Sequence, residues 1–151
     1  MMEVDLPQHT EEELEFARNI QETLEPKLVE GEIKKFISVE GDEKPYIHQG
    51  VLEKDKVDTV VMSGSSDSGD VSWIMPMNFF LTATWPLGVP AHSWQATSSS
   101  GSSLGMKGML YAAKIFTAIA YDLLNNPSLV EEAKAEFNRR TKKRKYISPL
   151  K

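Results

Sequence analysis

The stretch from Gly105 to Leu124 constrains the fold more than any other part of this 151-residue sequence. Its only charged residues are two lysines and one aspartate, so both faces of the helix that it predicts are largely apolar. A helix with one apolar face suits the surface of a domain, whereas a helix that is apolar nearly all round has to be buried. We therefore expect a long helix in the interior of the domain.

Further helices are expected near the two ends of the chain. Thr10 and Glu13 have the Thr-x-x-Glu spacing of a capping box, and apolar residues follow at helical intervals, which predicts a helix over residues 10–25. Pro26 is expected to end this helix, because proline has no amide hydrogen to donate. Residues 126–127, Asn-Pro, suit the N-cap and first position of another helix.

Strands are expected between these helices. Residues 57–62, 71–76 and 78–85 are rich in β-branched and aromatic side chains, while residues 38–56 are charged, broken by glycine and proline, and predict a surface loop. The sequence thus predicts an α/β fold with few strands, packed by a long buried helix and two further helices. So small a sheet would not cover all of these helices, which indicates part of a larger domain.

The composition excludes several classes of site. The chain has no cysteine, which rules out a disulfide framework, a thiolate metal site and a cysteine nucleophile within it. No apolar run approaches the roughly 20 residues of a membrane span, and the acidic N-terminus lacks the features of a signal peptide. We therefore expect a soluble, cytoplasmic protein without a membrane partner.

Charge is distributed unevenly along the chain. Seven of the 17 basic residues lie in the last 13 positions, and the remaining 138 residues carry 10 basic against 22 acidic side chains. An acidic body argues against a broad nucleic-acid-binding face. The basic C-terminal segment is expected to be a solvated helix end, with contact to nucleic acid or to an acidic partner as the alternative.

Two loops carry polar residues in an otherwise apolar setting. Residues 63–73, SGSSDSGDVSW, contain Asp67 and Asp70, and residues 91–105 contain His92. In α/β proteins, sites lie in the loops that follow the strands. These two loops are therefore the candidate site.

Each of these residues also has a purely structural interpretation. His92 could be a metal ligand or a general base, or a histidine hydrogen-bonded within the core. Asp67 and Asp70 could bind a metal or a cationic group, or form a turn by bonding their own backbone. The amides of residues 98–105 precede a helix and could receive an anion, and Lys107 could contact an anion or be solvated.

Other residues that could carry chemistry show no motif. His9 and His48 are expected on the surface, and Trp73, Trp85 and Trp94 flank the two loops, where they could line a pocket or pack in the core. There is no serine-hydrolase elbow, no His-Glu-x-x-His and no dinucleotide fingerprint. The residues alone therefore assign no catalytic group.

Three motifs nevertheless resemble a known family. GSSDSGDVSW (64–73), TATWPLGVPAHSWQ (82–95) and GMKGMLYAAKIFTAIAYDLL (105–124) are similar to the C-terminal part of the zinc-dependent amidohydrolases related to aminobenzoyl-glutamate utilization protein B. These enzymes belong to the aminoacylase and carboxypeptidase clan of metallopeptidases. The similarity runs from about Leu6 to Pro149.

The resemblance implies roles for the two loops. In the family the histidine of the second motif binds zinc or manganese, which here is His92. Asp67 would lie close to the active site, and Asp70, in the same motif, is placed on the substrate side. Met106 stands where the family often has histidine. The other metal ligands and the glutamate general base belong to the N-terminal half of the catalytic domain, which this chain does not resemble.

The resemblance also implies the reaction. The substrate would be a small amide, such as an N-acyl amino acid, an aminobenzoyl-glutamate-like amide or a dipeptide-like compound. In the complete enzyme the metal polarises the amide carbonyl and activates water, while a glutamate moves the proton.

Residues 1–151 match only the C-terminal part of such a catalytic domain, with the lid domain and the N-terminal half absent. We therefore expect the lone chain to be inactive and to bind no metal alone. It should pair with a complementary half and self-associate through apolar surface. The alternative is a non-catalytic binding or interaction module derived from that scaffold.

Overall fold

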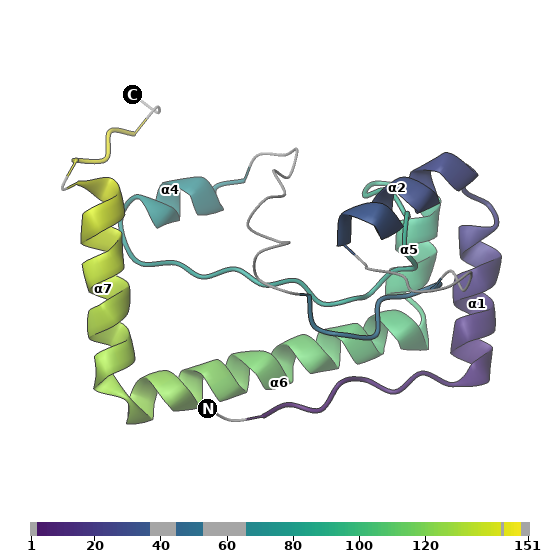
Figure 1. The fold of residues 1–151 in the computed structure, drawn as a ribbon, viewed down its shortest axis with the longest axis horizontal. Coiled ribbons are helices and arrows are strands. Elements are labelled where there is room, and N and C mark those ends of the chain that lie inside the picture. Colours follow the sequence, from purple (N-terminus) through teal and green to yellow (C-terminus); the bar gives the residue numbers. More distant parts are fainter. Residues whose placement is uncertain (1–2, 37–44, 53–65, 143, 149–151) are drawn as a thin grey trace. The chain divides into compact units, whose positions relative to one another are not determined.

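The computed structural model describes residues 3–36, 45–52, 66–142 and 144–148 (Figure 1). These residues form six helices and no strand. The helices are α1 (Glu11–Gln21), α2 (Pro26–Phe36), α4 (Ser68–Ser72), α5 (Trp94–Ser100), α6 (Ser103–Asn125) and α7 (Pro127–Thr141). None of the helices in these ranges combines the length and apolar character that a bilayer span requires.

The chain divides into two compact units. Unit 1 comprises Met1–Glu3, Met62–Phe80 and Phe116–Lys151, and unit 2 comprises Val4–Val61 and Leu81–Ile115. Helix α6 contributes its first half to unit 2 and its second half to unit 1.

The predicted α/β fold is wrong for the part of the chain that the structure describes. Residues 71–76 begin inside α4, where the Val71 amide bonds the Asp67 carbonyl at 3.3 Å. Residues 78–85 form neither helix nor strand. A strand needs a neighbour to share its backbone hydrogen bonds, and the described residues supply none. The third expected strand, 57–62, and most of the loop expected over 38–56 lie outside the described residues.

Helix α1 forms where the capping box predicts it. Thr10 Oγ1 accepts the Glu13 amide at 3.3 Å, and the Glu13 side chain accepts the Thr10 amide at 2.9 Å. The helix ends at Gln21, four residues before its predicted end. Pro26 was expected to end this helix but instead begins α2, which suits a residue with no amide hydrogen to leave unpaired.

Helices α6 and α7 also form where they were expected, but α6 is not buried as predicted. Leu104 and Ala118 are its buried apolar side chains, whereas larger ones lie exposed: Met106, Met109, Leu110, Phe116, Tyr121, Leu123 and Leu124. Helix α7 begins at Pro127, yet Asn126 makes no side-chain cap bond. The described residues therefore leave much of the apolar surface of α6 exposed, although so apolar a helix was predicted to be buried.

The core of unit 2 joins three segments that are distant in sequence. Ala17 of α1, Ile47 of the 45–52 loop and Leu104 of α6 are all essentially inaccessible, and Leu14 and Ala83 pack against them. At Gly108 a Cβ atom would lie 2.5 Å from the Ala83 carbonyl oxygen. A side chain at this position would therefore separate α6 from the segment that packs on it.

Backbone hydrogen bonds fix the loops of unit 2. The Leu87 amide donates to the Tyr46 carbonyl at 2.8 Å, and Gln21 Nε2 donates to the Leu87 carbonyl at 3.1 Å. Gly88 follows with φ 86°, where a Cβ would lie 2.9 Å from the Val29 Cα. Only glycine suits this turn, which leads directly into the His92 loop.

Unit 1 has few buried side chains among its described residues. The rings of Phe80 and Phe116 meet at 5.0 Å with an interplanar angle of 58°. Ala118 and Thr141 are buried, and Thr141 Oγ1 donates to the Phe137 carbonyl at 2.9 Å. Stability in this unit rests on local helix contacts more than on a core.

Candidate functional site

His92 lies in a tightly fixed turn before α5. Its φ of 62° is in the left-handed region, which non-glycine residues rarely adopt and which recurs at functional sites. The next residue, Ser93, is the N-cap of α5: its hydroxyl accepts the Ala96 amide at 3.1 Å and donates to the Pro90 carbonyl at 2.7 Å. The surrounding bonds therefore hold the backbone of His92 in this uncommon conformation.

The imidazole of His92 is exposed, and no hydrogen bond to it is found in the described part of the chain. The structural alternative, a histidine hydrogen-bonded in the core, is therefore wrong. Trp94, two residues on, is 60% exposed, so His92 is not enclosed by it. What the turn presents is a ring with both nitrogens open to a ligand.

Asp67 and Asp70 come together on the short helix α4 in unit 1. Asp67 is the N-cap of α4 but makes no side-chain cap bond; its Oδ1 accepts Ser66 Oγ at 3.4 Å. Asp70 Oδ1 accepts a hydrogen bond of 2.7 Å from the Tyr146 hydroxyl. Among the described residues, no backbone amide bonds either carboxylate, as the turn-forming alternative required.

The three predicted site residues are divided between the units. Asp67 and Asp70 belong to unit 1 and His92 belongs to unit 2. Within the described ranges, no three His, Cys, Asp or Glu side chains converge closely enough to hold a metal ion. His92 is thus not part of a three-ligand group in the described ranges, and zinc sites generally need at least three protein ligands.

A buried polar cluster in unit 2 was not predicted from the sequence. Glu13 is buried, and its Oε2 lies 2.6 Å from Lys107 Nζ and 3.7 Å from His9 Nδ1. Lys107 Nζ also donates to the Gln8 carbonyl at 2.8 Å. The cluster therefore fastens the N-terminal segment and α1 to the start of α6.

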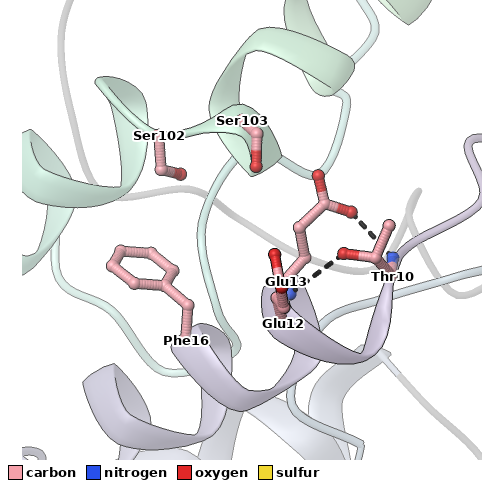
Figure 2. Close-up of a pocket in the computed structure, with 6 residues that line it drawn as sticks. All are labelled: Thr10, Glu12, Glu13, Phe16, Ser102 and Ser103. Carbon is pink, nitrogen blue, oxygen red and sulfur yellow. Dashed lines mark hydrogen bonds between the residues drawn. The ribbon is translucent and has the colours of Figure 1, made fainter.

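The hydrogen bonds to Glu13 decide its charge. Burial would raise the pKa of this carboxyl, but hydrogen bonds from Lys107, the Thr10 amide and Ser103, with the charge of Lys107, lower it from 4.5 to about 2. Figure 2 shows the Glu13 side chain reaching between Thr10 and Ser103. Glu13 thus stays ionised although little of its side chain is exposed to solvent.

An anion contact at the start of α6 was considered only as an alternative in the sequence, with a solvated Lys107 favoured. The structure places the Glu13 carboxylate beside Lys107 and the Ser103 side chain, and no hydrogen bond from an amide of residues 98–105 to it is found among the described residues. Lys107 therefore contacts an anion from within the chain. The shallow pocket beside it, about 200 Å³, is lined by the six residues drawn in Figure 2: Thr10, Glu12, Glu13, Phe16, Ser102 and Ser103.

The expected surface positions of two histidines are wrong. The His9 side chain is 3% exposed, and its Nδ1 has no hydrogen-bond partner in the described residues. His48 is half-buried; burial lowers the pKa of its imidazole, opposed by a hydrogen bond with the Gly50 backbone. The sequence showed the capping-box spacing of Glu13 and a lysine near a helix start, but nothing that linked either of them to His9.

The tryptophans do not form a core. Trp73 and Trp94 are exposed, while Trp85 is half-buried and its Nε1 donates to Ser100 Oγ at 2.8 Å. None of the three lines the pocket of Figure 2. Each lies at or contacts a helix end instead: Trp73 is the C-cap of α4, Trp94 begins α5, and Trp85 bonds the last residue of α5.

Comparison with known proteins supports the family suggested by the motifs. The chain is 29% identical over 152 positions, 95% of its length, to one of the subunits of p-aminobenzoyl-glutamate hydrolase from Escherichia coli (strain K12). It spans about a third, 32%, of that relative's length. No family model and no solved structure matches the chain. The resemblance read from the three motifs is thereby confirmed.

Proposed function

We propose that this chain is a segment of a metal-dependent amidohydrolase that cleaves N-acyl amino acids or aminobenzoyl-glutamate-like amides. The observation that carries the proposal is the 29% identity over 95% of the chain to a protein named as a subunit of p-aminobenzoyl-glutamate hydrolase. Because the chain spans 32% of the relative, most of the residues that such a reaction needs would come from other sequence.

His92 is the residue of this chain that we assign to the metal, zinc or manganese. Its ring is exposed, and a hydrogen-bonded turn holds its backbone. The turn fixes the point from which the side chain leaves the backbone, and we propose that a hydrogen bond from the completing segment would orient the ring, as is usual for metal-ligating histidines. The described residues do not gather three potential ligands at any point, so we propose that the site is completed by a second polypeptide segment.

A zinc titration followed by the NMR signals of the three imidazoles tests this assignment. We expect the His92 signals to move with zinc, and those of His9 and His48 to stay, because their rings are buried or half-buried. Binding should be weak, since one imidazole gives little affinity alone. His92→Ala should abolish the response; zinc shifts unrelated to His92 would refute its role.

Activity is the second test. The purified chain with zinc or manganese should release no p-aminobenzoate from p-aminobenzoyl-glutamate. Adding a polypeptide that corresponds to the unmatched two thirds of the relative should give metal-dependent hydrolysis, lost with His92→Ala. Turnover by the lone chain, or a reconstituted activity that His92→Ala leaves unchanged, would contradict the proposal.

A non-catalytic interaction module is the second candidate. It is favoured by large apolar side chains that lie exposed in unit 1, among them Ile74, Phe79, Phe116 and Leu124. Apolar surface of this kind marks sites of association. Light scattering should then show self-association at micromolar concentration, and the mixture described above should stay inactive although the two polypeptides bind.

A further inference from the structure

Helix α4, which carries the two candidate aspartates, is not held by its own residues. It spans only Ser68–Ser72, and isolated helices shorter than about 12 residues are marginal in water. Its N-cap, Asp67, makes no side-chain cap bond, and none of its residues is buried. Locally, Ser66 Oγ accepts the Ser68 amide at 3.1 Å, but no buried side chain anchors the helix, so contacts from elsewhere in unit 1 add to its order.

The C-terminal segment supplies two such contacts. The Tyr146 hydroxyl donates to Asp70 Oδ1 at 2.7 Å. The guanidinium carbon of Arg144 lies 5.0 Å from the ring centroid of Trp73, the C-cap of α4. A cation over an indole ring is attracted by the ring quadrupole. Two alternate residues of the segment thus bind the middle and the end of α4.

The segment is itself anchored on α7. Lys142, at the C-cap of α7, has φ 50°, a left-handed conformation that ends the helix. The amide and Nε of Arg144 then both donate to the Thr141 carbonyl, at 2.9 and 3.2 Å. Figure 1 shows this segment leaving α7 at the end where α4 also lies. Arg144 therefore links the last turn of α7 to Trp73.

The electrostatics favour the contact with Asp70. The hydrogen bond to Asp70, with burial and the Asp70 charge, raises the pKa of the Tyr146 phenol above its usual 10. The phenol thus remains a donor throughout the neutral range. The basic segment, which the sequence predicted to be a solvated helix end, contacts α4 through at least one of its basic residues.

We propose that residues 144–148 form a strap that positions α4, with Arg144 and Tyr146 as its positioning residues. The strap fixes the carboxylates of Asp67 and Asp70 relative to α7. Its existence rests on the contacts above; only the suggestion that it presents these carboxylates to an amide substrate rests on the proposed function.

Amide hydrogen exchange of the full chain, measured residue by residue by NMR, tests the strap. The amides of residues 69–71 and 73–75 bond within α4 and its flanks. Tyr146→Phe and Arg144→Ala should each speed their exchange about three- to tenfold, which corresponds to roughly 0.7–1.4 kcal/mol, and the double variant more. Exchange in the middle of α7 should stay unchanged.

Two matched variants sharpen the test. Lys145→Ala removes the exposed side chain between the two contacts and should leave α4 exchange as in the unaltered chain. Asp70→Asn keeps an oxygen acceptor for the Tyr146 hydroxyl and should retain most of the protection that Asp70→Ala loses.

The strap would be refuted by exchange of α4 within twofold of the unaltered chain in the Tyr146→Phe and Arg144→Ala double variant. It would equally be refuted by the same acceleration in α7, since the variants would then have loosened all of unit 1. Because the measurement needs neither metal nor substrate, failure of the zinc titration leaves its result intact.

Discussion

Unit 2 buries seven of the eight apolar side chains that form the described core, whereas unit 1 buries Ala118. Unit 2 also holds the ion pair of the buried Glu13 and the partly exposed Lys107, with the Gln8 carbonyl as a further acceptor for the lysine. Unit 1 relies instead on Phe80 and Phe116, and on the strap across α4. The same apolar helix, α6, thus runs from a built core into a region with little cover.

The difference between the units shows that an apolar side chain is not necessarily a buried one. In its first half α6 buries Leu104 and lets Ala83 approach closely at Gly108, whereas its second half carries exposed Phe116 and Leu124. The other face of the first half is exposed as well, at Met106, Met109 and Leu110. Apolar composition is common to both halves, but burial also needs a partner surface. Unit 2 supplies a partner surface for Leu104 from its own segments, so we expect its core to form without a partner protein.

The largest expected effect contrasts two leucines of α6. Leu104 is 0% exposed, and Leu104→Ala should lower the free energy of unfolding by about 2–5 kcal/mol because it leaves a cavity. Leu124 is 83% exposed, and Leu124→Ala should change it by less than about 0.5 kcal/mol. Urea denaturation followed by circular dichroism measures both. Equal losses would break the comparison, because Leu124 would then be covered in solution.

A smaller effect is expected at the buried carboxylate of unit 2. Glu13→Gln leaves Lys107 without its ion-pair partner and should lower the free energy of unfolding by about 1–3 kcal/mol. Glu12→Gln, at an exposed neighbour, is the control and should have little effect.

The pH dependence of that loss follows from the pKa of Glu13. The carboxyl has a pKa of about 2 in the folded chain and 4.5 as its ordinary value. Its lowered pKa therefore stabilises the fold fully above about pH 5, and this contribution disappears as the pH falls towards 2. Urea titrations should show the difference between the unaltered chain and Glu13→Gln shrinking over that range. A difference that is constant with pH would contradict the ion-pair explanation.

The smallest effect is expected in unit 1. Lys142 adopts φ 50°, and Lys142→Gly relieves the left-handed strain, so it should stabilise the chain by about 0.5–1 kcal/mol. Lys145→Gly, also exposed but without a positive φ, should not stabilise it. Thermal unfolding compares the two variants. Equal effects would show that the turn after α7 is not strained.

Local signals predicted the helices better than the sheet. The capping box at Thr10, the apolar run of α6 and Pro127 at the start of α7 are local signals, and the three helices that they predict formed, although α1 ends four residues early. Helices α2, α4 and α5 were not predicted. The strand propensity of residues 78–85 could not show whether a neighbouring strand exists, because that depends on distant sequence. The prediction that α6 is buried was wrong for the same reason, because burial also depends on whether distant sequence supplies a partner surface.

The candidate site was predicted only in part. His92 and the two aspartates could be named from their motifs, but their exposure, the left-handed turn and the bond to Tyr146 depend on tertiary contacts. The Glu13 and Lys107 pair joins residues 94 positions apart, so no local pattern shows it. Its two halves, a capping glutamate and a lysine at a helix start, were both visible separately.

That pair also carries an evolutionary consequence. Replacing Glu13 alone leaves Lys107 without its ion-pair partner, and replacing Lys107 alone leaves a buried carboxylate without its partner. Either single substitution therefore gives a less stable protein. Related sequences should therefore keep both residues or replace both together. In an alignment of related sequences, we expect the positions of Glu13 and Lys107 to vary together, and the position of the exposed Glu12 to vary independently of both.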